Sequence, residues 1–153
     1  MHQVSKVARD FLKKNENKKI VFTNGCFDIL HEGHVRYLNE AKKLGDLLVV
    51  GVNSDASVKR LKGQNRPINS ESSRKFILEN LKAIDMVEIF ENDDPLELIK
   101  IVKPKVLVKG GDWAVEKIIG HDFVKSIGGT TISLSFINGF STTKIIEKSQ
   151  GKA

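Results

Sequence analysis

Residues 20–34 read IVFTNGCFDILHEGH, and this stretch contains the first unit of the predicted fold. Its start, IVFTN, is rich in β-branched and aromatic residues, which is typical of a buried strand, and Gly25 ends that strand. Its end opens a helix, because residues 33–44 carry apolar side chains at helical spacing along one stripe. A strand, a turn and a helix therefore follow one another directly.

The same alternation continues to the end of the chain. Helical spacing assigns Val7 to the apolar face of a first helix. It likewise assigns Phe76 to the apolar face of a later helix, which Asn69 or Ser70 caps. Further strands are predicted at residues 47–52, 86–90, 106–108 and 130–134, and helices at 4–14, 95–102, 123–127 and 141–148, with a short one inside 53–69. We therefore predict an α/β fold, a Rossmann-like parallel sheet of about five strands with helices on both faces. It forms a single domain over residues 1–153.

Composition narrows the possible partners. The chain has 153 residues with a formal net charge of +6, but its lysines are dispersed and only 7% of its residues are aromatic. Nucleic-acid surfaces interleave basic and aromatic residues, so a small polyanion is favoured over nucleic acid. The single cysteine, Cys26, is predicted to lie in the core and favours a reducing, cytoplasmic setting. The sequence contains no run of about 18 apolar residues, so it predicts no membrane-spanning helix.

The predicted ligand site lies beyond the carboxyl ends of the strands, where open parallel sheets bind their ligands. Four segments fall there, residues 24–34, 53–66, 109–113 and 138–143, all rich in glycine and polar residues. The glycine-rich loops of P-loop and dinucleotide-binding proteins do not follow the first strand. Instead, His31 and His34 share one face at a helix start, where unpaired N–H groups and the helix dipole favour an anion.

The pattern Gly25-x-Phe27-Asp28-x-x-His31-x-Gly33-His34 resembles the signature of the cytidylyltransferase-like nucleotidyltransferase superfamily, including its His-x-Gly-His motif. This resemblance implies the nucleotidyltransferase fold and an in-line attack on the α-phosphorus of a nucleoside triphosphate.

Within that superfamily, the stretches at 51–55, 58–63, 108–112 and 139–143 are similar to those of heptose 1-phosphate adenylyltransferases, the nucleotidyltransferase domain of bifunctional heptose-synthesis proteins. The similarity runs over residues 20–146. It implies transfer of AMP from ATP to D-glycero-D-manno-heptose 1-phosphate, forming ADP-heptose and pyrophosphate for lipopolysaccharide core or a related surface glycan.

Other functions stay open at this point. One is a cytidylyltransferase, or a guanylyltransferase, acting on another sugar or polyol phosphate such as glycerol 3-phosphate. Cytidylyltransferases carry an arginine five positions before the serine that corresponds to Ser141, whereas this chain has Phe136, which argues against them. Another is a nucleotide sensor or basic RNA-binding module on the same fold, which would bind without turnover.

The resemblance also implies the site residues. His31, His34 and Lys62 are predicted to be catalytic, the histidines holding phosphate oxygens and the lysine neutralising the growing charge. Lys59, Arg66 and Arg74 are predicted to bind the sugar phosphate, with a structural ion pair as the alternative for both arginines. The predicted nucleotide-binding residues are Thr23, Asn24, Gly25, Phe27, Asp28, His31, His34, Lys62, Gly110, Asp112, Ser141, Thr142 and Thr143.

The predicted cofactor is Mg²⁺, with ATP as co-substrate. Mg²⁺ is expected mainly on triphosphate oxygens and water, so no dedicated metal ligand is predicted, and Asp28 and Asp112 are the side chains expected nearest to it or to the ribose. Trp113 is predicted to pack rather than to stack on a base. The resemblance further implies a homodimer, and on composition we expect no nucleic-acid or membrane partner. Bifunctional members carry a sugar-kinase domain upstream, so a separate sugar kinase is expected to supply the phosphorylated sugar.

Overall fold

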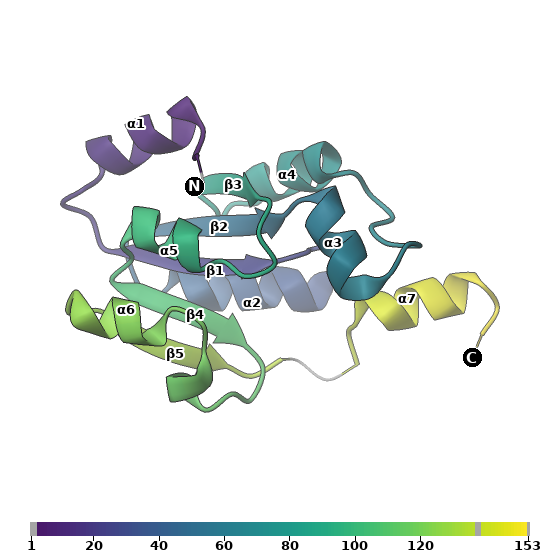
Figure 1. Ribbon diagram of the computed structural model, residues 1–153. Helices are drawn as coiled ribbons and strands as arrows, with labels where there is room; N and C mark the ends of the chain where they lie inside the picture. The colour runs from purple at the N-terminus through teal and green to yellow at the C-terminus, as the bar shows by residue number, and fades with distance from the viewer. Residues whose placement is uncertain (1–2, 137–138, 153) are drawn as a thin grey trace.

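The computed structural model describes residues 3–136 and 139–152, and a parallel sheet forms its centre (Figure 1). Within these residues the strands are β1 (Ile20–Gly25), β2 (Leu47–Asn53), β3 (Met86–Phe90), β4 (Val106–Gly110) and β5 (Thr130–Leu134), in the order β3-β2-β1-β4-β5. The helices are α1 (Lys6–Lys14), α2 (Glu32–Lys42), α3 (Asp55–Lys62), α4 (Glu71–Glu79), α5 (Leu96–Val102), α6 (His121–Ser126) and α7 (Thr142–Ser149), with a short 3₁₀ turn, η1 (Val115–Lys117). All strand pairs are parallel, which confirms the predicted five-stranded α/β fold.

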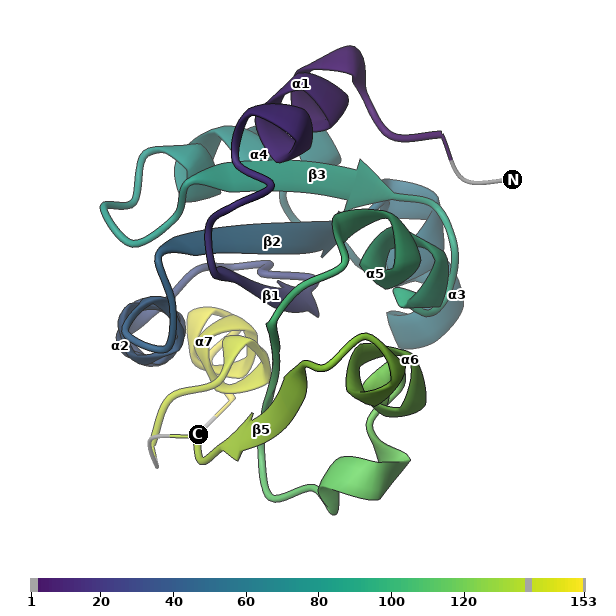
Figure 2. The same ribbon diagram turned by 90° about the vertical axis from the view of Figure 1, so that its left-hand side faces the viewer.

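Helices cover both faces of the sheet, as Figure 2 shows from the side. One apolar cluster joins α2 and α4 to the sheet, and the other joins α1, α5 and α6 to its opposite face. Neighbouring strand residues alternate between the two clusters, so Val21 belongs to the first and Phe22 to the second. This double coverage explains why the strands are apolar at almost every position.

Two apolar side chains do not lie where their helical spacing placed them. Val7 is 74% exposed and Phe76 is 70% exposed. Helix α1 reaches the sheet through Ala8, and α4 buries Arg74 and Leu78 instead of its phenylalanine. The predicted helix is present, but the burial expected for Phe76 was wrong, because Arg74 and Leu78 form the buried side of α4.

The strand order creates a crevice between β1 and β4. The chain runs from β1 outward through β2 to β3 and then returns to place β4 beside β1. After β1 the chain crosses to the α2 face, and after β4 it crosses to the α6 face, so the two connections diverge. Such a switch point at the carboxyl ends of parallel strands is where ligands bind.

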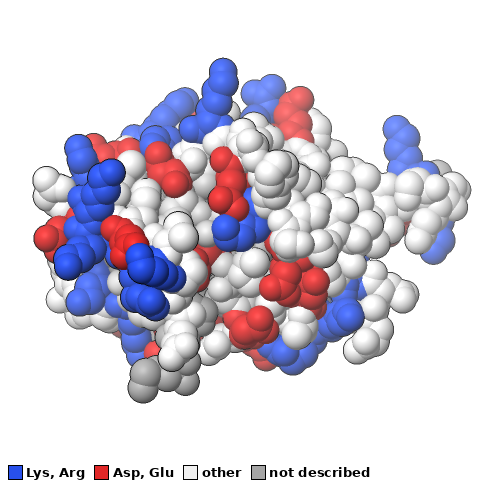
Figure 3. Space-filling model, turned by 90° about the horizontal axis from the view of Figure 1, so that it is seen from above, with Lys and Arg blue, Asp and Glu red and all other residues white. Residues whose placement is uncertain are grey.

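A group of basic side chains lies at the end of the sheet opposite this crevice. Helices α1, α2, α5 and α6 all have lysine in their last turn, and these turns lie at the end of the sheet where the strands begin. Figure 3 shows basic side chains gathered toward that end. In the residues that the structure describes, no helix is long and apolar enough to span a membrane.

Candidate active site

A cleft of about 570 Å³ lies at the carboxyl ends of β1 and β4. All four segments that the sequence assigned to this edge contribute to its lining, although Asn138 falls outside the described residues. The lining comes from the turn before α2, the end of α3, the loop before α5, the end of β4 and the segment that leads into α7.

His31 and His34 form a reciprocal cap at the start of α2. The His34 backbone N–H donates to His31 Nδ1 at 3.4 Å, and the His31 backbone N–H donates to His34 Nδ1 at 3.2 Å. The two rings stack with their centroids 3.8 Å apart. Because each Nδ1 accepts a hydrogen bond, the neutral rings carry their protons on Nε2, which leaves two N–H donors for a ligand.

Both imidazoles are neutral near pH 7. Burial, reinforced by the Lys62 ammonium and by His31 when it is protonated, lowers the pKa of His34 to about 4. Burial also lowers the pKa of His31. The pair therefore offers N–H donors to the cleft rather than positive charge.

The depressed pKa of His34 gives the stability of the fold a pH dependence. In the unfolded chain a histidine takes up its proton near pH 6.5, but folded His34 does so only near pH 4. Between these values the unfolded state holds more protons, so the free energy of unfolding falls as the pH falls. We expect wild type to lose about 2 kcal/mol more than His34→Asn between pH 7.5 and 4.5, allowing for the partial exposure of the ring.

Urea unfolding of both proteins at the two pH values measures this difference. Asparagine does not titrate, and its side-chain oxygen can replace Nδ1 as acceptor of the His31 N–H. Equal pH-dependent losses in the two proteins would contradict the proposed burial of a neutral imidazole.

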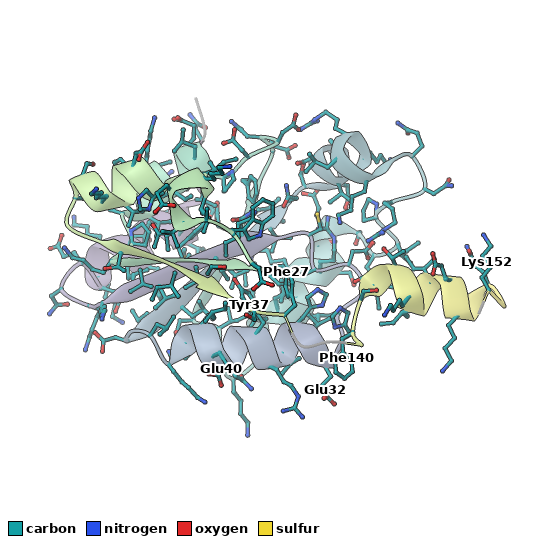
Figure 4. All side chains as sticks on the ribbon, turned by 90° about the horizontal axis from the view of Figure 1, so that it is seen from below. Phe27, Glu32, Tyr37, Glu40, Phe140 and Lys152 are labelled. Atoms are coloured by element: carbon teal, nitrogen blue, oxygen red, sulfur yellow. The ribbon has the colours of Figure 1, made fainter. Side chains whose placement is uncertain are left out.

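Three aromatic side chains, Phe27, Tyr37 and Phe140, line the cleft and lie near one another (Figure 4). Phe27 meets the His34 ring edge-on at 5.4 Å, and Phe140 lies parallel to His31 with centroids 6.2 Å apart. A Cβ at Gly33 would lie 2.8 Å from the Phe140 Cβ, so only glycine permits this approach. Tyr37 donates to or accepts from the Thr23 hydroxyl at 2.7 Å, and burial raises the pKa of Tyr37 to about 12.

A second helix start faces the same cleft. Ser141 is the N-cap of α7, and its hydroxyl accepts the Lys144 N–H at 3.0 Å. The Thr142 hydroxyl donates to the Ile29 carbonyl at 3.0 Å and so ties α7 to the turn before α2. Lys62, in the last turn of α3, completes this set with its ammonium group. Two helix N-termini and a lysine around one space form an arrangement suited to a polyphosphate.

The structure brings most of the predicted site residues together and leaves four outside the lining. Thr23 is buried against Tyr37, and Asp112 accepts a hydrogen bond from Ser135 at 3.2 Å. Lys59 and Arg74 also fall outside the lining. The predicted residues that line the cleft are Asn24, Gly25, Phe27, Asp28, His31, His34, Lys62, Arg66, Gly110, Ser141, Thr142 and Thr143.

Arg74 has a structural role, contrary to its prediction as a sugar-phosphate ligand. It is 1% exposed, and its guanidinium donates to the carbonyls of Cys26, Asn53 and Asn69 at 2.8–3.0 Å. It also pairs with Asp55 at 2.9 Å. The alternative of a structural ion pair therefore describes this residue better.

Asp28 likewise has partners other than the Mg²⁺ or ribose that the sequence suggested. Its carboxylate is buried and accepts the backbone N–H groups of Ile68 and Asn69 at 2.5 and 2.8 Å. The Arg66 guanidinium lies against the same carboxylate, with Nε 3.4 Å from Oδ2. These donors leave Asp28 committed to the protein itself.

Several lining residues were missed or misassigned by the sequence analysis. Cys26 is half-buried at the cleft rather than in the core, and burial raises the pKa of its thiol. Trp113 is 51% exposed at the rim, where its Nε1 donates to the Gly110 carbonyl at 2.9 Å and the Lys109 ammonium lies 5.4 Å from the ring centroid. The lining residues to which the sequence assigned no role include Tyr37, Asn53, Leu61, Asp93, Asp94, Pro95, Ile119 and Phe140.

The donor set of the cleft does not form a metal cage. Within residues 3–136 and 139–152, no three His, Cys, Asp or Glu side chains come together in a way that could hold a metal ion.

Comparison with known proteins agrees with this geometry. A family model described as "Cytidylyltransferase-like" matches residues 22–148, which include both histidines and the start of α7. The chain belongs to the cytidylyltransferase-like family. The resemblance drawn from the His-x-Gly-His motif is thereby confirmed at the level of the family.

Individual relatives of this cytidylyltransferase-like chain are close. It is 54% identical over 146 residues to "Bifunctional protein HldE" of a Nitratiruptor species, covering 95% of this chain and 30% of that protein. It is 55% identical over 141 residues to the protein of the same name in Campylobacter jejuni subsp. jejuni, covering 92% of this chain and 30% of that protein. The chain thus spans about 30% of the length of these relatives.

A solved structure shares the fold. The crystal structure of the lipopolysaccharide core biosynthesis protein from Thermoplasma volcanium superimposes with a TM-score of 0.62 at 34% sequence identity. The match covers 78% of this chain and 97% of that one.

Proposed function

We propose that this chain transfers AMP from ATP to D-glycero-D-manno-heptose 1-phosphate, forming ADP-heptose and pyrophosphate. The observation that carries the proposal is the meeting of the His31–His34 pair, Lys62 and the start of α7 around one cleft. The close relatives named HldE and the lipopolysaccharide core biosynthesis protein support the choice of sugar and a role in lipopolysaccharide core or a related glycan.

The residues of the chain contribute positioning and electrostatics rather than a nucleophile. An oxygen of the sugar phosphate forms a bond to the α-phosphorus, and the bond from that phosphorus to the bridging oxygen of the leaving pyrophosphate breaks. The Nε2–H groups of His31 and His34 donate to the phosphate oxygens on which charge grows, and Lys62 neutralises part of that charge. Ser141 and Thr142 hold the far phosphates at the start of α7.

Mg²⁺ is proposed to arrive with ATP and to be held by triphosphate oxygens and water, where it neutralises phosphate charge. Since the cleft has no cage of its own among the described residues, this chain's part is to orient the phosphates.

ATP is the proposed donor because of the resemblance to heptose 1-phosphate adenylyltransferases, and the rim of the cleft argues against CTP. Phe136, 62% exposed, occupies the position at which the cytidylyltransferases that the sequence resembles carry an arginine. A Cβ at Gly110 would lie 2.5 Å from its ring, so the phenyl group lies directly on the end of β4. An apolar ring there offers a base a flat contact and no cation.

Pyrophosphate release from ATP, GTP and CTP, each paired with heptose 1-phosphate and with glycerol 3-phosphate, tests the proposal. We expect turnover with ATP and heptose 1-phosphate to exceed every other pair. Preference for CTP with glycerol 3-phosphate would establish the cytidylyltransferase alternative, and preference for GTP the guanylyltransferase. Nucleotide binding with no turnover of any pair would support the sensor.

The remaining predictions belong to the same proposal. The reaction needs a sugar 1-phosphate, so a sugar kinase activity must precede it, and the cytoplasm is the compartment that supplies ATP. We also propose a homodimer, which exposed apolar side chains such as Phe76 and Ile68 support. Sedimentation equilibrium measures that state directly.

A further inference from the structure

We infer that Asp28 is a positioning residue that holds the loop after α3, and with it Lys62, against the turn that carries His31. The inference rests on the proposed function for the role of Lys62, but its structural part can be tested without turnover.

The carboxylate of Asp28 lies at the junction of two distant segments. Asp28 precedes His31 by three residues and is 2% exposed. It accepts the N–H groups of Ile68 and Asn69, and Arg66 reaches both its carboxylate and, from Nη2, its backbone carbonyl at 3.0 Å. We call this set of four contacts the Asp28 latch.

The latch is the far anchor of an otherwise exposed loop. Helix α3 ends at Lys62, and Gly63 turns the chain with a φ of 102° that favours glycine. The loop folds back at once, because the Arg66 N–H donates to the Gly63 carbonyl at 3.2 Å. Residues 61–65 are all exposed, so the first deeply buried partner that this loop meets is Asp28.

A second set of buried bonds extends the latch across the sheet edge. The Asn69 carbonyl, next to the latched N–H, accepts from Arg74, which also binds the carbonyls of Cys26 and Asn53. Asp28, the loop and the ends of β1 and β2 therefore form one connected polar network. Such networks fix geometry because a buried donor or acceptor left unpaired is costly.

The latch also explains how a carboxylate fits beside a polyphosphate site. Two backbone N–H groups and a guanidinium balance its charge, so it does not repel an incoming anion. Asp28 therefore acts on the reaction indirectly, because the latch sets the distance between the two histidines and Lys62.

Asp28→Asn tests this role, because the amide presents an NH₂ group to N–H donors and cannot satisfy the latch. A displacement of about 1 Å at a charged group can cost about 10²-fold in rate, so we expect kcat to fall by up to that factor. In a Lys62→Met background the same change should cost less than about twofold, since the group that it positions is gone. Costs that multiply in the double variant would overturn the inference.

Trypsin supplies a readout that needs no activity. Cleavage after Lys62 in the folded protein should rise at least about tenfold in Asp28→Asn, because the released loop opens more often. Arg66→Gln weakens the latch from the loop side and should raise the same cleavage, which keeps the test valid if Asp28→Asn fails to fold. Cleavage at the wild-type rate in both variants would also overturn the inference.

Asp46→Asn is the matched control. Asp46 also accepts a backbone N–H, from Lys19 at 2.8 Å, but it lies just before β2, at the end of the sheet where the strands begin. It should change neither cleavage after Lys62 nor kcat. Wild type could turn over none of the donor and acceptor pairs while trypsin still cleaves the Asp28→Asn and Arg66→Gln variants faster after Lys62. In that case the proposed function fails and the latch stands.

Discussion

Replacing His34 with asparagine should lower kcat by about 10²–10³ with the fold intact. The substitution removes the Nε2–H donor that faces the cleft but keeps an oxygen that can accept the His31 N–H, so the cap of α2 survives. Since His34 is neutral near pH 7, the loss should be of similar size from pH 6.5 to 8.5. Steady-state pyrophosphate release measures it.

Glu32→Gln is the control for this experiment. Glu32 lies between the two histidines in sequence, yet it is exposed on the outer side of α2 and pairs with Arg36 at 2.8 Å (Figure 4). Its replacement should leave kcat within about twofold, since exposed pairs contribute little. A folded His34→Asn protein with wild-type kcat, or with a change in KM alone, would refute the role of this ring in the transition state.

Replacing Arg74 with methionine should destabilise the protein by about 3–5 kcal/mol. The apolar side chain fills a similar volume but leaves three carbonyls and the Asp55 carboxylate without their donor. For a domain of this size the midpoint of thermal unfolding should fall by roughly 10 °C. Thermal and urea unfolding followed by circular dichroism measure both quantities.

Arg60→Met is the control for Arg74→Met, because it removes the same charge from an exposed position. Arg60 pairs with Asp93 at 2.7 Å, but both side chains are about half exposed. The variant should lose less than about 1 kcal/mol. An Arg74→Met protein as stable as wild type, with a raised KM for the sugar phosphate, would restore the ligand role that the sequence suggested.

The sheet could be predicted from the sequence because each strand and helix is marked by residues that are neighbours in the chain. Each strand is an apolar run and each helix an apolar stripe, so the parallel α/β architecture follows from neighbouring residues. The position of His31 and His34 together at a helix start was predicted for the same reason, since both belong to one turn.

The roles of Asp28 and Arg74 could not be read in this way. The Asp28 carboxylate accepts backbone N–H groups 40 and 41 residues away in the chain, and Arg74 donates to carbonyls that lie 5, 21 and 48 residues away. Nothing in the sequence marks a backbone group as the partner of a side chain. Without those partners in view, the sequence analysis assigned both polar side chains to ligand binding. Phe140 falls within the segment 138–143 that the sequence assigned to the ligand site, but its contact with His31 joins distant parts of the chain and has no local pattern.

Helix α7 has a practical consequence. It buries none of its eight residues, projects from the body, and is tied to the turn before α2 through Thr142 (Figure 1). So short a helix is marginal in water without support, and a polyphosphate across its first turn would supply that support. Amide exchange in this segment should therefore slow when a nucleotide occupies the cleft. Measuring it would allow donors to be screened without a label, before any acceptor has been identified.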